Sequence, residues 1–308
     1  MSAPEKTFTN FTPEQAAQYA QGRGTSYPLE IYQAILAYHR GERKTLLDVG
    51  TGPGKVVFDL LPYFDHGIGS DSSAGMIGQA NKIANERGFG DRTSFVIANG
   101  ESCDKALAET ELGSVDVMTV AMAAHWLDLP AFYAAAARSL RPGGTLAMWT
   151  ASSLFVHPSE PQAQQLQEIL FDLEIRMLRD YHEPRNVLSR NAYEDLELPW
   201  AKSEEGSAFD KASFRRQGWD RDGMPSAPSL PDGTPGPFLS QEEESIDDLE
   251  KGLGSASSVI RWRQENAGQA LTPQDPVVLT CSRLRQVLGG KTSMLVSPSF
   301  SLLLMRRK

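Results

Sequence analysis

The chain has 308 residues, of which 40% are hydrophobic and 22% are charged, and its formal net charge at pH 7 is −9. This composition is ordinary for a soluble globular protein, and the negative charge argues against a general nucleic-acid-binding surface. The two cysteines, Cys103 and Cys281, are far apart and form no C-x-x-C motif, so neither a disulfide framework nor a metal site is expected. No apolar run is long enough to span a membrane, and the N-terminus has no apolar signal core. We therefore expect a cytoplasmic protein without membrane or nucleic-acid partners.

The N-terminal residues 1–44 are expected to form a helical lid. Thr12 has the position of an N-cap before a helical pattern, and Pro28 opens a second helix. Two tyrosines, Tyr19 and Tyr27, lie between these points. They either pack this segment against the core or cover a bound ligand.

A glycine turn follows, preceded by a short buried strand over residues 45–49. Gly50, Gly52 and Gly54 occupy alternate positions, where the missing Cβ lets the backbone turn tightly and lets a ligand touch the main chain. Amides at the start of the helix expected over 55–61 then point at that ligand. The spacing G-x-G-x-G differs from the G-x-G-x-x-G of a dinucleotide site, and the first glycine and the hydroxyl residue of a P-loop are missing.

A second strand over 66–71 ends in Asp71, 21 residues after Gly50, where a parallel strand would end beside the first. A carboxylate there can accept hydrogen bonds from both ribose hydroxyls of a nucleotide ligand. The alternative is that this segment caps the helix expected over 74–87, because aspartate and serine both cap well. Met76 lies one turn into that helix and either flanks an adenine or packs in the core.

Two further strands are expected to end near the same ligand. The third covers 93–98, just before Asn99 and Gly100, and the fourth covers 115–121 and is nearly all apolar, as a central parallel strand should be. His125 and Trp126 follow the fourth strand at the edge where an open α/β sheet places its site. These two side chains are candidates for contact with a cofactor or substrate, and the alternative for the histidine is a structural role.

The alternation of strand and helix over residues 45–150 requires a doubly wound parallel sheet. A helix over 130–140 and a Pro-Gly-Gly turn lead into a fifth strand over 145–150. Two apolar segments, 292–296 and 300–305, are expected to complete the sheet as antiparallel sixth and seventh strands.

Residues 152–285 are expected to form a cap inserted between the fifth and sixth strands. Their middle part is rich in Pro, Gly, Ser and charge, with isolated aromatic residues such as Trp219. These aromatics either wall a substrate pocket, since pockets are mostly apolar, or line a small helical core. The expected division is a lid at 1–44, a core at 45–151 and 286–308, and the cap at 152–285.

The glycine turn, Asp71, Asn99-Gly100-Glu101 and Arg141-Pro142-Gly143-Gly144 resemble, in this order, the landmarks of class I S-adenosylmethionine (SAM)-dependent methyltransferases of type 11. The fold so implied is a doubly wound, seven-stranded, mostly parallel α/β sheet with an inserted helical cap. A narrower resemblance, carried by Tyr19…Gly22-Arg23…Tyr27-Pro28 and by Ala121 to Trp126, is to the fungal trans-aconitate methyltransferase-like group. The resemblance implies SAM as the cofactor, S-adenosylhomocysteine as its product, and these cofactor-binding residues: Asp48, Gly50, Thr51, Gly52, Gly54, Asp71, Ser72, Met76, Asn99, Gly100, Ala121 and His125.

The implied activity is methyl transfer to a small molecule, either a carboxylate or a secondary metabolite, by a monomer or homodimer. A carboxylate acceptor is already ionised and needs no base, and Arg23 would clamp it. For another acceptor His125 is the candidate base. The candidate substrate-binding residues are Tyr19, Tyr27, Trp126 and Trp219. The alternative is a SAM-binding regulatory or scaffold protein that transfers no methyl group.

Overall fold

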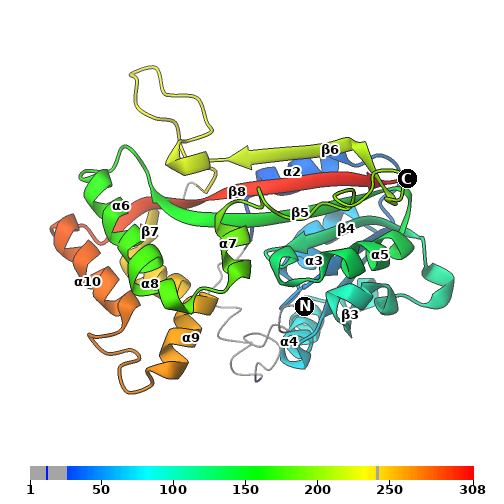
Figure 1. Cartoon of the computed structure of the whole chain (residues 1–308), viewed down its shortest axis with the longest axis horizontal. Helices are drawn as coiled ribbons and strands as arrows, with labels where there is room; N and C mark the ends of the chain where they lie inside the picture. The colour runs from blue at the N-terminus through cyan, green and yellow to red at the C-terminus, as the bar shows by residue number, and fades with distance from the viewer. Residues whose placement is uncertain (1–11, 13–25, 241–242) are drawn as a thin grey trace.

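The computed structural model describes residues 12, 26–240 and 243–308 (Figure 1). The helix expected after Thr12 and the candidate residues Tyr19 and Arg23 lie outside the described residues.

The core of the molecule is a mixed sheet with the strand order β3-β2-β1-β4-β5-β8-β6, and β7 pairs with the far end of β8. The first five strands in this order are mutually parallel, whereas β8 runs antiparallel to its neighbours. This arrangement confirms the predicted doubly wound, mostly parallel α/β fold. The strands are β1 (Thr45–Val49), β2 (His66–Asp71), β3 (Thr93–Ile97), β4 (Val115–Ala121), β5 (Leu140–Val156), β6 (Phe209–Trp219), β7 (Glu243–Ser245) and β8 (Ser293–Arg307).

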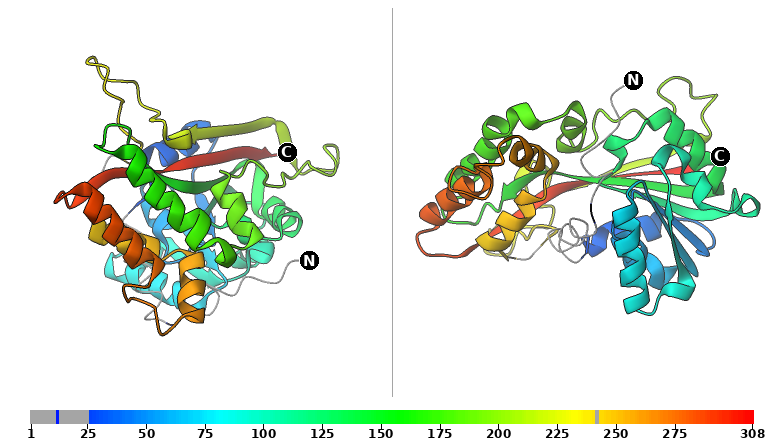
Figure 2. Two further views of the ribbon diagram at one scale, coloured as in Figure 1. Left: turned by 60° about the vertical axis from the view of Figure 1, so that its left-hand side comes forward. Right: turned by 90° about the horizontal axis from the view of Figure 1, so that it is seen from below.

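Helices cover both faces of this sheet, and a further group of helices packs beyond one end of it (Figures 1 and 2). The α-helices are α2 (Leu29–Tyr38), α3 (Lys55–Leu60), α4 (Ala74–Glu86), α5 (Leu129–Ser139), α6 (Ala163–Phe171), α7 (Pro184–Arg190), α8 (Ile246–Gly254), α9 (Ser257–Glu265) and α10 (Pro276–Leu288). None of the helices in the described ranges is long and apolar enough to cross a membrane.

Alternate side chains of the central strands enter two separate cores, as the period of two along a strand requires. Leu47 and Met118 pack with Phe132 of α5 on one face of the sheet. Their strand neighbours Leu46 and Val117 pack with residues of α2 and α3 on the other face. Burial on both faces explains why β4 is almost wholly apolar in sequence.

The prediction of two short strands around Pro298 is wrong, because residues 293–307 form the single long strand β8. Pro298 lies opposite Leu154 of β5, between the stretch of β8 that pairs with β7 and the stretch that pairs with β6. On that side β8 has no partner strand at this point, so the missing N–H of the proline breaks no ladder. The sixth strand of the sheet is instead β6, at residues that were expected to belong to the cap.

The long strands β5 and β8 run out of the sheet and into the helical cap (Figure 1). Val156 of β5 pairs with Val296 of β8, and both side chains lie in the hydrophobic core of the cap. The same core takes side chains from α6, α8, α9 and α10. The cap is thus attached to the sheet by a continuous two-stranded ribbon, and Figure 2 shows the cap helices gathered at one end of the molecule.

Candidate cofactor and substrate site

A cavity of about 1190 Å³ lies where the carboxyl ends of the parallel strands meet the cap. Its lining comes from the loops after β1, β2, β3 and β4, from the last part of β5, and from α7, α9 and the segment after α6. Ligands of open α/β sheets bind at this edge. The volume exceeds the roughly 300–1,000 Å³ of a typical small-ligand pocket, so a cofactor and a second molecule have room together.

The glycine turn forms one wall of this cavity. Gly50 and Gly52 have φ angles of 70° and 54°, in the left-handed region that favours glycine. A Cβ on Gly50 would lie 2.7 Å from that of Ala123, whereas one on Gly52 would meet nothing within 4 Å. The backbone of Gly52 therefore borders open space, where a ligand can touch it. Gly54 is not among the lining residues. A Cβ there would collide with Phe58 and Phe95, so the close packing at the start of α3 requires a glycine.

Asp48 is a buried carboxyl group at the floor of the cavity. The Thr119 hydroxyl donates a 2.6 Å hydrogen bond to Oδ1, while Oδ2 has no hydrogen-bond partner among the described residues. Burial raises the pKa of Asp48 from its ordinary 3.8 to about 7, against the lowering effects of Thr119 and Thr51 and with a smaller raising effect of Asp71. A buried carboxylate oxygen without a partner is a fitting acceptor for a cationic group such as an amino-acid ammonium.

Asp71 lies at the end of β2, and its carboxylate accepts hydrogen bonds from the backbone of two neighbouring loops. Its Oδ2 accepts from the Gly52 amide and its Oδ1 accepts from the Ser73 amide, both at 2.9 Å. The N-cap of α4 is Ser73, whose hydroxyl accepts from the Met76 amide. The helix-cap alternative therefore applies to Ser73, while Asp71 lines the cavity together with Ser72 and Met76.

The loop after β3 supplies Asn99, Gly100 and Glu101 to the lining. Asn99 makes no side-chain capping bond to the 3-10 turn that follows, so its amide is available to a ligand. Glu101 is committed to the fold, because its Oε1 accepts a 2.8 Å hydrogen bond from the Asp128 amide.

His125 and Trp126 lie in a short helical turn after β4, next to Ala121, and all three line the cavity. His125 is buried, and its Nδ1 is 2.8 Å from the Tyr193 hydroxyl. The His125 and Trp126 rings lie 4.9 Å apart between centroids. Burial raises the pKa of Tyr193, so this phenol stays protonated. From sequence, Tyr193 was one of the isolated aromatics expected either to wall a substrate pocket or to line a small helical core. No local pattern connects it with His125.

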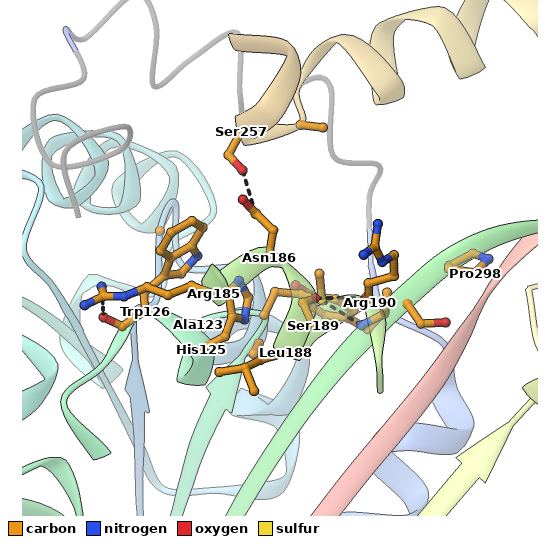
Figure 3. Close-up of a pocket in the computed structure, with 18 of the residues that line it drawn as sticks. Ala123, His125, Trp126, Arg185, Asn186, Leu188, Ser189, Arg190, Ser257 and Pro298 are labelled. Atoms are coloured by element: carbon orange, nitrogen blue, oxygen red, sulfur yellow. Dashed lines mark hydrogen bonds between the residues drawn. The ribbon is translucent and has the colours of Figure 1, made fainter. Parts of the chain in front are cut away.

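Helix α7 brings a set of polar side chains that sequence reasoning missed. Arg185, Asn186, Ser189 and Arg190 all line the cavity (Figure 3). Arg185 donates a 2.7 Å hydrogen bond to the carbonyl oxygen of Trp126, which joins the cap to the loop after β4. The only sequence signal for these residues was a polar helical stretch, and such a stretch is usually a solvated surface.

The other candidate substrate residues have different environments. Tyr27 lines the cavity, with its ring edge-on to Trp149 at 5.4 Å and Lys55 Nζ 5.2 Å from its centroid. Trp219 is outside the lining; it is 8% exposed and belongs to the core that includes Phe300, its partner across the β6–β8 ladder. Within residues 12, 26–240 and 243–308, no three acidic, histidine or cysteine side chains form a group that could hold a metal ion.

Residues 46–144 match the methyltransferase domain family. The chain is 37% identical, over 146 residues, to a Saccharomyces cerevisiae protein described as a "probable S-adenosylmethionine-dependent methyltransferase", with 47% of this chain and 48% of that one aligned. It is 34% identical over 152 residues to a methyltransferase of Aspergillus terreus, with 48% and 44% aligned. The chain thus spans about half the length of the curated relatives that it matches.

Among solved structures, a protein from Anaeromyxobacter dehalogenans described as a "putative type II methyltransferase" has a similar fold. The TM-score is 0.62 and the sequence identity 21%, over 92% of this chain and 97% of that one. The agreement over nearly both whole chains includes the cap as well as the sheet.

Proposed function

We propose that this chain, whose residues 46–144 form a SAM-dependent methyltransferase domain of the class I fold, transfers a methyl group to a small-molecule acceptor. The observation that carries the proposal is the pairing of Asp48 and Gly52 on one wall of the cavity. A buried carboxylate oxygen without a partner and a glycine backbone that faces open space line the same cavity. Together they provide an acceptor for a cationic amino group and space for the remainder of a nucleoside-bearing ligand.

SAM, when bound, supplies an already activated methyl group, so the protein contributes mainly position and orientation. Gly50 and Gly52 would leave space for the cofactor, and Asp48 would accept from its ammonium group. Asp71 would accept from its ribose hydroxyls, and Asn99 from its adenine amino group. The remaining cavity, between His125 and the cap, would hold the acceptor.

We propose a carboxylate or a secondary metabolite as the acceptor, with transfer to oxygen. The resemblance to the fungal trans-aconitate methyltransferase-like group supports a carboxylate, which needs no general base. For a phenolic acceptor, His125 would take the proton, oriented by its contact with Tyr193.

The alternative is a SAM-binding regulatory or scaffold protein. It is the weaker candidate because the cavity extends well past the glycine turn into the cap. A protein that only sensed SAM would have no need of that second space.

The proposal is tested by calorimetric titration with SAM, S-adenosylhomocysteine and NADH. Micromolar binding of both adenosyl ligands, with no response to NADH, is the expected result. Folded protein that binds neither would overturn the assignment. Release of S-adenosylhomocysteine during incubation with a panel of carboxylic acids and phenols would then separate an enzyme from a protein that only binds SAM.

A further inference from the structure

The part of the cavity that is lined by the cap has a distinct character, and we call it the outer chamber. It is formed by Leu170, Leu173, Leu178, Arg190, Leu253 and Val259. Its leucines and valine belong to the hydrophobic core of the cap and turn part of their surface to the cavity. Apolar surface of this kind favours an apolar ligand, because polar groups lose their hydration there without gaining partners.

Three of the serines that line the cavity near the cap make hydrogen bonds within the protein. Ser152 shares a hydrogen bond of 2.9 Å with Ser299, and Ser189 shares one of 2.6 Å with Thr150. Ser257 accepts from Asn186 at 3.0 Å (Figure 3). These hydroxyls therefore offer little to a polyhydroxylated ligand.

Unlike the leucines and the valine of the outer chamber, Arg190 has a charged side chain. It ends α7, and its side chain is 32% exposed and lines the cavity. The nearest carboxylate is that of Glu174, 4.0 Å from its Nε, which is too long for a hydrogen bond. The structure records no hydrogen bond from this guanidinium to any described residue, although it has five N–H donors.

Other arginines near the cavity differ in this respect. Arg185 donates to the carbonyl oxygen of Trp126 and points away from Arg190 in Figure 3. Arg261 donates to the Tyr181 carbonyl oxygen and to the side chain of Asn186. Arg190 thus has the donor capacity to bind an acidic group in the bidentate manner typical of arginine.

The charge balance limits how acidic the ligand is. Glu174 also lines the cavity beside Arg190 and would repel a second negative charge. Resting on the proposed methyl transfer, we infer that the acceptor is a mostly apolar molecule with a single acidic group. Arg190 binds that group, and the apolar body lies against the leucines of the outer chamber.

The test is calorimetric titration of the protein saturated with S-adenosylhomocysteine, using decanoate, decanol and decanedioate as probes. Decanoate is expected to bind about tenfold more tightly than either of the other two. Arg190→Gln is expected to reduce decanoate affinity to that of decanol while leaving decanol and S-adenosylhomocysteine affinities unchanged. Arg179→Gln, at an exposed arginine outside the lining, is the matched control and is expected to change none of them.

A second variant separates ligand binding from a structural ion pair. Glu174→Gln removes the competing carboxylate, so decanoate affinity is expected to rise about threefold. If Arg190 serves only the fold, both variants would lower the melting temperature and neither would change the preference for decanoate over decanol.

Three results would overturn the inference: equal affinity for decanoate and decanol, equal affinity for decanedioate, or an unchanged decanoate affinity in Arg190→Gln. Failure of all three probes in protein that binds S-adenosylhomocysteine would also overturn it and leave the proposed function intact. Failure to bind S-adenosylhomocysteine would overturn both.

Discussion

The Tyr193 hydroxyl lies 2.8 Å from Nδ1 of His125, and this contact joins the cap to the loop after β4. Both side chains are buried, and the backbone of Tyr193 has a φ angle of 59°, which is unusual for a bulky residue. A residue is held in such a conformation only when its surroundings require it. The contact therefore sets the orientation of the imidazole from a distant part of the chain.

Tyr193→Phe is expected to lower the free energy of unfolding by about 1–3 kcal/mol, because a buried ring nitrogen loses its partner. Turnover is expected to fall about tenfold with a base-requiring acceptor, while the Kd for S-adenosylhomocysteine stays within about twofold. Urea unfolding and steady-state kinetics measure the two effects. Tyr133→Phe is the control, since its buried hydroxyl donates to the Glu197 carbonyl oxygen outside the cavity; it should lose stability alone.

Asp48→Asn is expected to change the pH dependence of stability. The folded-state pKa of about 7 lies above the ordinary 3.8, so the folded protein binds more protons and the Asp48 contribution to stability falls as the pH rises from about 4 to 7. The asparagine variant should lack this loss, which amounts to at most about 4 kcal/mol. Thermal melts of both proteins at pH 5 and pH 8 measure the difference. If wild type and Asp48→Asn lost the same stability between pH 5 and pH 8, the raised pKa of a buried Asp48 would be contradicted.

The same substitution is expected to weaken SAM binding about 10- to 100-fold, because the ammonium group loses a carboxylate partner. Below pH 7 the wild-type protein should release a proton on binding SAM, since the ammonium favours the ionised carboxyl group. Calorimetry in two buffers of different ionisation enthalpy measures this release, which Asp48→Asn should abolish. Asp220→Asn, at a buried acid outside the cavity, should bind SAM like the wild type.

Asp71→Ala and Ser73→Ala separate a cofactor contact from a helix cap. Asp71 accepts from the Gly52 amide, so its loss loosens the glycine turn and also removes the ribose partner. We expect SAM affinity to fall by more than about tenfold. Ser73→Ala removes the N-cap of α4 and should cost about 1 kcal/mol of stability with little effect on affinity. Equal effects of the two variants on SAM binding would contradict the ribose role of Asp71.

Substitutions at Trp219 test whether its side chain packs in the core or contacts the substrate. Because it packs in the core beside Phe300, Trp219→Ala is expected to lower the free energy of unfolding by about 3–5 kcal/mol. Trp219→Phe keeps most of the buried surface and should retain full activity. A large rise in KM for the phenylalanine variant at unchanged stability would instead place Trp219 in contact with substrate.

The strands and turns up to residue 150 were predictable because their signals are local. β1 and β4 have the bounds that their apolar runs indicated, since a strand buried on both faces is mostly apolar. Asp71 and His125 could be named as site residues because parallel strands of one sheet end at one edge, whereas Asp48 was named from the family resemblance.

The remainder was decided by contacts between distant parts of the chain. An edge strand such as β6 has one open side and carries charged residues there, so its sequence resembles a loop. Pro298 divides an apolar run that tertiary pairing nevertheless joins into one strand. By itself the sequence determined the parallel core and the residues at its carboxyl edge, because periodicity and turn chemistry act over a few residues. Only the tertiary structure decided that Tyr193 meets His125 and that Arg190 lines the cavity, because packing across long loops leaves no periodic trace in the sequence.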